Sequence, residues 1–474
     1  MSMNIQELKN KKIAILWFWK EGKSTLSFLQ SIWCEDITVL DRTVKHEVFP
    51  LVPLNKGESD CKELGGFCTD NLDAIQGRFP TSREWQTNIN YITWEHYLDN
   101  LEIYDYIFKS PWISPYTNNL QKYKNKLWSQ TKLFFELYKW KIITVTQTKW
   151  KSTTATLVYE LLKNAGYNLK LVWNIWNPVL DEIDLNSPYD FIIYELSSYM
   201  LEDLDNHHSF ISILWNIFSD HLDWHQGFEN YKKAKLNILK NAENLLIWED
   251  LSKEIIELLQ NKNYKIFWLN NSYYSHIWND FFINWKSIDT EINPIIPWEH
   301  NLSNICAILW VCDILNIKYE IFQKTINSFS WLPHRLQNIW TYKWITFIDD
   351  AISTTPESTI EWIRSFNQNI WTIFLWWSDR WYKFEKLVKE LENKKIFNIV
   401  LFPDSWNRIK LLLDERFKIL ETKSMQEATE FAFKNTKEWE ICLLSTASPS
   451  YSLWKNFEEK WDEFKKKIKE KNKK

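Results

Sequence analysis

The chain has 474 residues and a formal net charge of −4. This length predicts two to four domains, each large enough to bury its own core. The nearly balanced charge gives no support to a nucleic-acid-binding or membrane-surface function. No apolar run approaches the roughly 18 residues of a membrane span. The polar segment 1–12 leads directly into an apolar strand, so we expect no signal peptide and a cytoplasmic location.

Tryptophan and glycine occur in unusual numbers. The chain holds 31 Trp and only 7 Gly, whereas an ordinary chain of this length holds roughly 33 Gly. Many of the Trp stand at turns and strand ends, where glycine is common. We hypothesise that most of them are glycines in the organism, as follows if a UGA codon is read there as glycine. A truly Trp-rich protein is the alternative, and Trp33 and Trp454 are candidates for genuine tryptophans.

The first predicted elements form a nucleotide-binding pattern. A buried strand at 12–16 precedes a segment that becomes Gly-x-Gly-x-x-Gly when Trp17 and Trp19 are read as glycines beside the true Gly22. Asp41 follows the next strand, about twenty residues on. A strand, a glycine-rich turn, a helix and a later acidic residue are typical of βαβ units that bind dinucleotides. The pattern suits a nucleotide diphosphate equally well.

The next segment, 45–86, carries four of the seven Gly and has no clear periodicity. We interpret it as an insertion and assign it no function. A strand at 104–108 follows it, and this strand leads into the Ser110-Pro111 turn.

The central stretch of the sequence is KIITVTQTKWKSTT, residues 141–154. It predicts a buried strand and a tight loop that ends in Lys151-Ser152-Thr153-Thr154, followed by an amphipathic helix from residue 155 to near Gly166. This is the layout of a phosphate-binding loop, in which backbone N–H groups hold phosphates, the lysine neutralises charge and a hydroxyl binds magnesium. However, Gln147 and Trp150 stand where glycines are expected, and an indole at 150 would block the approach of a phosphate. Taken alone, the stretch fits a strand–turn–helix without phosphate equally well.

Polar side chains follow several later strands. Asn174 lies in a turn between two Trp, and Glu195 directly follows an apolar strand at the sheet edge where α/β proteins bind ligands. Local sequence also allows Glu195 to be a surface or capping residue. His221, between Asp220 and Asp223, suits a hard metal ion, although such clusters are more often helix caps. The lysines of the helix predicted at 228–239 could equally be a solvated basic face. Beyond residue 336, strands and helices alternate again and predict a third, smaller α/β unit.

The motifs, taken together and in this order, resemble those of the Mur ligase family of ATP-dependent amide-forming enzymes, and within it the glutamate-adding branch. The motifs are VTQTKWKSTT, LVWNIWNP, YELSSYML, FSDHLDWH, WEHNLSN, LPHRLQ, DDAISTTPEST, LWWSDRW and LLSTASPSYSLWKNFEEKWDEF. The resemblance covers nearly the whole chain apart from the insertion. It implies an α/β, three-domain architecture: a Rossmann-like UDP-substrate domain at 1–127, a P-loop-type ATP domain at 128–331 and a Rossmann-like glutamate domain at 332–474.

The resemblance also implies a set of site residues. The ATP site would comprise Thr148, Lys149, Trp150, Lys151, Ser152, Thr153, Asn301, Arg335 and Asp350. Magnesium would be held by Ser152, Glu195, His221 and Lys235, the last as a carbamylated side chain, and Lys151, Lys235, His221 and Glu195 would carry the catalysis. The substrates would contact Trp17, Phe18, Trp19, Asp41, Arg42, Ser110, Asn174, Ser197, Arg380, Ser450 and Phe457.

The reaction implied is the Mg²⁺- and ATP-dependent joining of glutamate, D-glutamate by expectation, to UDP-N-acetylmuramoyl-L-alanine through an acyl phosphate. It would serve cytoplasmic peptidoglycan precursor synthesis, and we expect a monomer. Three departures leave alternatives open. Recoding does not explain Gln147. A lysine common in the D-glutamate branch is missing after Asp350, and Arg380 replaces another lysine, so an L-glutamate-adding relative remains an alternative.

Two further rivals remain, one from another class of protein and one within the ligases. If the Trp are genuine, a non-catalytic binding protein is the better interpretation, because a loop with Trp150 should not hold ATP. A folate polyglutamate synthase would share the central domain, but the UDP-type first domain and the KNFEEKWDEF ending disfavour it.

Overall fold

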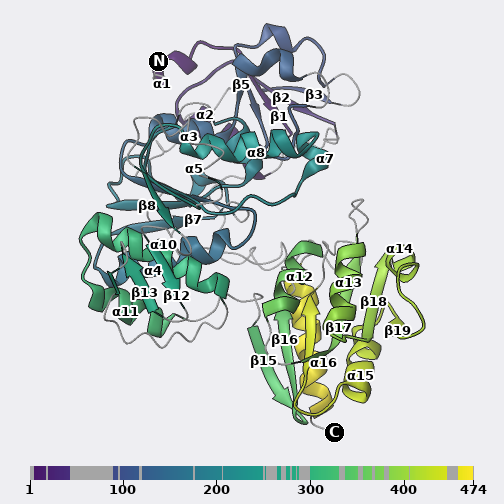
Figure 1. Ribbon diagram of the computed structural model, residues 1–474. Helices are drawn as coiled ribbons and strands as arrows, with labels where there is room; N and C mark the ends of the chain where they lie inside the picture. Colours follow the sequence, from purple (N-terminus) through teal and green to yellow (C-terminus); the bar gives the residue numbers. More distant parts are fainter. Residues whose placement is uncertain are drawn as a thin grey trace, which may run out of the picture.

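The structure, a computed structural model, describes most of the chain. The described residues are 5–17, 20–42, 89–93, 97–116, 120–173, 177–204, 207–248, 251, 264–267, 274–277, 280–283, 286–287, 299–329, 337–350, 356–365, 369–377, 384–404, 406–445 and 457–472. The predicted insertion at 45–86 lies outside them. Figure 1 shows three α/β units, with the N-terminal and middle units side by side and the C-terminal unit, in green to yellow, at the other end of the middle unit.

The first unit is a parallel sheet in the order β3-β2-β1-β4-β5. Its strands are β1 (Ile13–Leu16), β2 (Ile37–Asp41), β3 (Ile89–Thr93), β4 (Tyr106–Lys109) and β5 (Leu127–Trp128). Its helices are α1 (Ile5–Leu8) and α2 (Lys20–Ser31), with 3₁₀ turns at Leu101–Ile103 and Leu120–Lys126. The unbroken apolar run of β1 is buried throughout, as expected of a central parallel strand.

The middle unit has nine described strands in the order β14-β13-β12-β11-β10-β9-β6-β8-β7, of which β12, β13 and β14 pair antiparallel. The strands are β6 (Ile142–Thr146), β7 (Leu169–Val172), β8 (Phe191–Glu195), β9 (Ser209–Leu214), β10 (Ala242–Trp248), β11 (Tyr264–Phe267), β12 (Tyr274–Ile277), β13 (Asp280–Ile283) and β14 (Lys286–Ser287). The helices are α3 (Gln130–Leu137), α4 (Lys151–Asn164), α5 (Val179–Glu182), α6 (Ser198–Glu202), α7 (Leu222–His225), α8 (Phe228–Leu236), a 3₁₀ turn at Asn237–Leu239, α10 (Glu299–Leu315) and α11 (Tyr319–Ser328).

The third unit is a six-stranded sheet in the order β15-β16-β20-β17-β18-β19, parallel except for the β15–β16 pair. Its strands are β15 (Gln337–Tyr342), β16 (Ile345–Asp350), β17 (Ile370–Trp377), β18 (Asn398–Asp404), β19 (Lys418–Glu421) and β20 (Ile441–Ser445). Its helices are α12 (Pro356–Ser365), α13 (Glu385–Asn393), α14 (Trp406–Lys410), α15 (Met425–Asn435) and α16 (Phe457–Asn472).

The predicted α/β class is confirmed, and most of the predicted elements are present. From the sequence we expect a strand at 211–217 that ends in Asn216; β9 is shorter and stops at Leu214. The predicted helix at 228–239 is split, because its last turn is 3₁₀. The domain boundaries after 127 and 331 stay predictions, and the first of them falls inside β5, whose Trp128 pairs with Phe108 of the first sheet. Within the described residues, no helix is both long and apolar enough to cross a membrane.

Candidate functional site

The loop between β6 and α4 lies at the carboxyl edge of the middle sheet. Asn216, just beyond β9, holds this loop: its Oδ1 accepts hydrogen bonds from the backbone N–H of Thr148 at 2.9 Å and of Lys149 at 3.0 Å. Its Nδ2 donates to the carbonyl oxygen of Lys149 at 3.2 Å. The hydroxyl of Thr148 lies 2.6 Å from that of Tyr231 on α8. Side chains from the segment just beyond β9 and from α8 therefore fix the loop without glycine.

Gln147, the departure that recoding does not explain, is fully buried at the base of the loop. Its Nε2 donates to Thr154 Oγ1 at 2.6 Å, and its Oε1 accepts from Asn216 Nδ2 at 3.3 Å. Thr154 in turn donates to Asn304 Oδ1 of α10 at 2.6 Å. The backbone of Gln147 does not adopt a positive φ. Glutamine is thus compatible with the loop, because its amide links strand, helix and loop.

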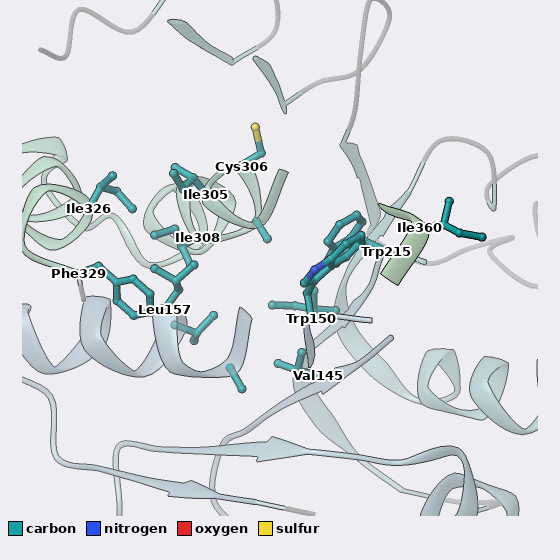
Figure 2. Packing of buried hydrophobic residues seen from close by; sticks show 14 of the residues in the cluster. Val145, Trp150, Leu157, Trp215, Ile305, Cys306, Ile308, Ile326, Phe329 and Ile360 are labelled. Carbon is teal, nitrogen blue, oxygen red and sulfur yellow. The ribbon is translucent and has the colours of Figure 1, made fainter. Parts of the chain in front are cut away.

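Trp150 occupies the N-cap position of α4 with φ 68° and ψ 12°. This left-handed conformation favours glycine and is an outlier for a bulky residue. The indole is almost completely buried and stacks on Trp215, with ring centroids 5.1 Å apart and an interplanar angle of 10°. Figure 2 shows the two indoles face to face in the buried cluster that also contains Ile305 of α10 and Ile360 of α12. The indole therefore fills buried space next to the N-terminal end of α4.

Four further described tryptophans share this backbone conformation. Trp17, Trp33, Trp344 and Trp439 have φ values of 68°, 67°, 63° and 69°. All four are exposed, so burial of the indole does not offset the strain. Trp33 was a candidate for a genuine tryptophan, and its φ favours glycine instead. Trp454 lies outside the described residues.

The N-terminus of α4 carries several polar groups near the loop. Lys151 Nζ donates to the carbonyl oxygen of Thr148 at 3.3 Å. The hydroxyl of Thr153 is buried and has no hydrogen-bond partner among the described residues. The first N–H groups of a helix lack intrahelical acceptors and attract anions. Together with the lysine, these groups could hold phosphate oxygens.

Glu195 ends β8 beside this loop and is 2% exposed. Within the described part of the chain, its Oε2 has no hydrogen-bond partner. A buried carboxylate oxygen without a donor is costly unless a cation or proton satisfies it. This orphaned oxygen is the observation that fits a cation best, and Asp and Glu oxygens are the ligands that Mg²⁺ prefers.

Lys235 of α8 lies on the other side of the loop and is equally buried. Its Nζ donates to Thr146 Oγ1 at 3.1 Å and to the carbonyl oxygen of Gln147 at 2.8 Å. Burial, and then the charge of Lys151, lower the pKa of Lys235 well below its usual range, although Asp220 and Glu195 oppose the shift. A neutral amine is the form that can react with CO₂ to give a carbamate.

His221 and Asp220 complete the cluster. Burial lowers the pKa of His221 to about 4 even though Asp220 opposes the shift, so the imidazole is neutral at pH 7. Burial raises the pKa of Asp220, but His221, Lys149 and Lys151 outweigh it and lower this pKa to about 2. Asp220 forms an ion pair with Lys149 at 3.6 Å. A neutral imidazole is the form that binds metal ions.

No cluster of three or more His, Cys, Asp or Glu side chains in the described ranges could by itself hold a metal ion. The proposed ligands include only two such residues, Glu195 and His221. A cation here would therefore need the hydroxyl of Ser152, a modified Lys235 or oxygens of a bound substrate as well.

The first sheet presents a second candidate site at the turn after β1. Gly22 is required there, because a Cβ at this position would lie 2.5 Å from the carbonyl oxygen of Trp17. Such close packing of helix and turn is the role of the third glycine in nucleotide-binding βαβ units. Ser110, at the end of β4, donates to Glu21 Oε2 at 3.4 Å. Asp41 is buried at the end of β2, and Arg42 follows it at the surface.

The remaining predicted site residues are placed only in part. Ser197 caps α6, because its hydroxyl accepts from the N–H of Met200 at 3.3 Å. Asp350 ends β16, where Ser445 Oγ donates to its Oδ2 at 2.7 Å. Asn301 lies in the first turn of α10 and Phe457 begins α16, and the side chain of neither is described. The predicted residues outside the described ranges are Phe18, Trp19, Asn174, Arg335, Arg380 and Ser450.

Sequence reasoning missed the residues that hold the loop from a distance. Asn216, Tyr231 and Tyr199 were not among the predicted site residues, yet each forms a hydrogen bond to a residue that was. The position of Asn216 just beyond a buried strand was a usable signal, because that is where the carboxyl edge of the sheet lies. Tyr231 and Tyr199 on helix faces gave none.

Comparison with known proteins adds independent information. The Mur ligase middle domain matches residues 145–312. The UDP-N-acetylmuramoylalanine–D-glutamate ligase of Streptococcus mutans serotype c is 27% identical over 391 residues, covering 80% of this chain and 86% of the relative. The enzyme of the same name from Natranaerobius thermophilus is 26% identical over 422 residues, covering 83% and 90%.

The fold is similar to solved structures of the same kind. A MurF ligase from Thermotoga maritima in complex with ADP has a TM-score of 0.58 and 14% identity, covering 99% of this chain and 97% of that one. At this sequence identity, the similarity shows only that the two chains share a fold. The match of the middle unit and the relatives that span four fifths of the chain agree with the motifs found in the sequence. Residues 145–312 therefore match the Mur ligase middle domain, and the chain is similar over most of its length to proteins named UDP-N-acetylmuramoylalanine–D-glutamate ligase.

Proposed function

We propose that the chain joins glutamate, D-glutamate in the first instance, to UDP-N-acetylmuramoyl-L-alanine at the expense of ATP. The observation that carries the proposal is the group around the start of α4. An orphaned carboxylate oxygen of Glu195, a neutral His221 and the side chain of Lys151 lie around a loop that precedes a helix N-terminus. These groups are suited to bind a nucleoside triphosphate together with a divalent cation.

The first step would form an acyl phosphate. A terminal carboxylate oxygen of the muramoyl-alanine substrate attacks the γ-phosphorus of ATP, a P–O bond forms, and ADP leaves with the electron pair of the broken bond. Lys151, the N–H groups at the start of α4 and the hydroxyls of Ser152 and Thr153 would bind the phosphates. They would stabilise charge that water otherwise has to solvate.

The second step would form the amide. The amine of glutamate attacks the acyl carbon, the tetrahedral intermediate expels inorganic phosphate, and the amine loses a proton. We assign glutamate to the third unit, and ATP to the joint between it and the middle unit, where Asp350 ends β16. Exclusion of water from this joint would protect the acyl phosphate from hydrolysis.

The cation in this proposal is Mg²⁺, and it would supply charge neutralisation of the phosphates. Glu195, His221, Ser152 and a carbamylated Lys235 would hold it. Lys235 is suited to carbamylation because its surroundings favour the neutral amine. The carbamate would turn a buried amine into a metal-binding carboxylate.

Binding of ATP depends on position 150 in this proposal. The indole of Trp150 fills space next to the N-terminal end of α4, where it stacks on Trp215. The backbone φ of Trp150, 68°, favours glycine. We therefore infer that glycine stands at 150 in the working enzyme, and by the same reasoning at 17, 33, 344 and 439. Tryptophan at 150 in a preparation that consumes ATP would refute the inference, and sequencing of peptides from the native protein would detect it.

The first unit would bind the UDP moiety through the turn after β1, Asp41, Arg42 and Ser110. The division into domains at 1–127, 128–331 and 332–474, the monomeric state and the cytoplasmic location stay predictions. So do the substrate roles of Phe18, Trp19, Asn174, Ser197, Arg380, Ser450 and Phe457.

An amide-ligase assay tests the proposal most directly. The chain with glycine at positions 17, 19 and 150 is incubated with ATP, Mg²⁺ and UDP-N-acetylmuramoyl-L-alanine, with D- and L-glutamate in parallel, and phosphate release and product mass are followed. We expect product with D-glutamate. Product with L-glutamate alone would support the alternative branch, which the lack of a lysine after Asp350 favours. Lys151→Ala, as a control, should abolish acyl-phosphate formation.

A further inference from the structure

Tyr199 lies beside the proposed cation site but has no role in the reaction described above. It belongs to α6, which directly follows the strand that ends in Glu195. Its hydroxyl oxygen lies 2.7 Å from Nδ1 of His221. One short segment thus provides both a proposed cation ligand and a hydrogen bond to a second ligand.

The ring of Tyr199 is held on several sides. Trp224 of α7 packs against it with ring centroids 4.7 Å apart, and His225 stacks on it at 5.9 Å. Trp112, in the loop after β4 of the first sheet, lies 5.8 Å away. Trp224 Nε1 donates to the carbonyl oxygen of Trp112 at 3.1 Å, which fastens the two units together at this point. The hydroxyl therefore has little freedom to move away from His221.

His221 itself has a constrained backbone. Its φ of 52° is left-handed, which is uncommon for a residue other than glycine, and such conformations persist where the surroundings enforce them. Among the described residues, the hydrogen bonds of the His221 ring involve Nδ1 and not Nε2. Metal-binding histidines commonly donate their second ring N–H to an oxygen acceptor such as a carboxylate, a backbone carbonyl or water, which fixes the tautomer and the orientation of the ring. The hydroxyl oxygen of Tyr199 is placed to accept from Nδ1–H in the same way.

We propose that Tyr199 is the positioning residue of His221: it occupies Nδ1 and so leaves Nε2 as the ring nitrogen that faces a divalent cation. The inference rests on the proposed function, because that function assigns the cation to His221. Tyr199 itself touches neither substrate nor cation in this proposal. Its hydroxyl acts through the ring of His221.

The test uses Tyr199→Phe, which removes only the hydroxyl, in the full chain with Trp150→Gly. Binding of Mn²⁺ is measured by electron paramagnetic resonance in the presence of ADP. We expect the Mn²⁺ dissociation constant to rise about tenfold or more, with the ADP dissociation constant measured without metal unchanged. Tyr116→Phe is the matched control, because the hydroxyl of this tyrosine also forms a 2.7 Å hydrogen bond, to Glu202, in the same region. It should change Mn²⁺ affinity less than twofold.

A double-mutant cycle isolates the effect. In the His221→Ala background, Tyr199→Phe should cause no further loss of Mn²⁺ affinity. An unchanged Mn²⁺ affinity of Tyr199→Phe, or an equal loss in the presence and absence of His221, would overturn the proposal. If His221→Ala alone leaves Mn²⁺ binding intact, the cation assignment of the proposed function fails instead.

A second readout does not depend on metal. The ¹⁵N chemical shifts of the His221 ring report its tautomer in the metal-free protein. We expect a single tautomer with Tyr199 and a mixture in Tyr199→Phe. Identical ring shifts in the two proteins would contradict the positioning role even if no metal binds.

Discussion

At the scale of single residues, backbone conformation gives information that composition alone cannot. The excess of Trp suggested recoded glycines, but it did not say which ones. The left-handed φ values of Trp17, Trp33, Trp150, Trp344 and Trp439 identify five positions where a Cβ is strained. These positions can be tested one by one.

Trp33 offers the simplest stability test. It is 60% exposed with φ 67°, so Trp33→Gly should relieve strain at little cost in burial. We expect the free energy of unfolding to rise by about 1 kcal/mol. Trp140→Gly is the control, because Trp140 is also exposed but has no positive φ and packs on Tyr138. Denaturant unfolding should show a lower free energy of unfolding for Trp140→Gly. A lower free energy of unfolding for Trp33→Gly as well would count against the glycine assignment.

Lys235 offers a test of chemistry at one residue. In the enzyme with glycine at 150, Lys235→Ala should lower kcat about 100-fold or more, because a buried group at the phosphates is lost. Added short-chain carboxylates should restore part of the activity if the lysine acts as a carbamate. Lys233→Ala, an exposed neighbour on α8, should leave kcat unchanged. Full activity of Lys235→Ala would remove the lysine from the site.

At the scale of elements, Ser197 at the start of the short helix α6 has two candidate roles, substrate contact and helix cap. The resemblance assigned it to the substrate, whereas its hydroxyl accepts the N–H of Met200 as a helix cap. Ser197→Ala should therefore cost about 1 kcal/mol of stability, and Ser197→Asn should cost much less, because asparagine caps equally well. Thermal unfolding measures both. A KM for the UDP substrate that rises in Ser197→Asn at unchanged stability would establish the substrate role beside the cap.

The first turn of α2 carries a group that titrates near neutrality. Burial, opposed by Ser110 and Lys109 and assisted by Asp203, raises the pKa of Glu21 from 4.5 to about 7. Between these values the folded chain binds more protons than the unfolded chain, so the free energy of unfolding falls as pH rises from 4.5 to 7. The variant Glu21→Gln lacks this pH-dependent contribution to the free energy of unfolding. We expect the variant to match the parent near pH 4.5 and to exceed it above pH 7 by on the order of 1 kcal/mol, after allowance for partial exposure.

The measurement for Glu21 is urea unfolding of both proteins across this pH range. The difference between them should grow as pH rises. A constant difference, or one that shrinks towards pH 7, would contradict the raised pKa.

At the scale of the whole molecule, sequence predicted the arrangement of elements better than the contacts between them. The strand, loop and helix around Lys151 were predictable because a short apolar run and an amphipathic helical period are local signals. The bonds of Asn216 to the loop join residues 67 and 68 positions apart, and the bond of Tyr199 to His221 spans 22. Such contacts leave no periodic trace in one sequence. Gln147 was an anomaly in the sequence, and the hydrogen bonds of its side chain to Thr154 of α4 and to Asn216 just beyond β9 explain it.

The joint between the first and middle units also depends on contacts of this kind. Lys109, at the end of β4, and Asp203, just after α6, form an ion pair at 2.6 Å with almost no exposure of either side chain. The same joint carries a hydrogen bond from Ser24 to Asp181 at 2.7 Å and one from Ser114 to the carbonyl oxygen of Trp224 at 2.5 Å. Charged and polar bonds therefore connect the proposed UDP unit to the proposed ATP unit.

Removing one partner of this ion pair should be much worse than removing both. Lys109→Met leaves Asp203 buried without its counter-charge, and we expect a loss of about 3–5 kcal/mol. The double variant Lys109→Met, Asp203→Leu removes both charges and should recover most of that loss, because it also removes the desolvation penalty. Denaturant unfolding of the two variants and the parent measures this. If the double variant is as unstable as Lys109→Met, the joint depends on the packing of these side chains and not on balanced charge.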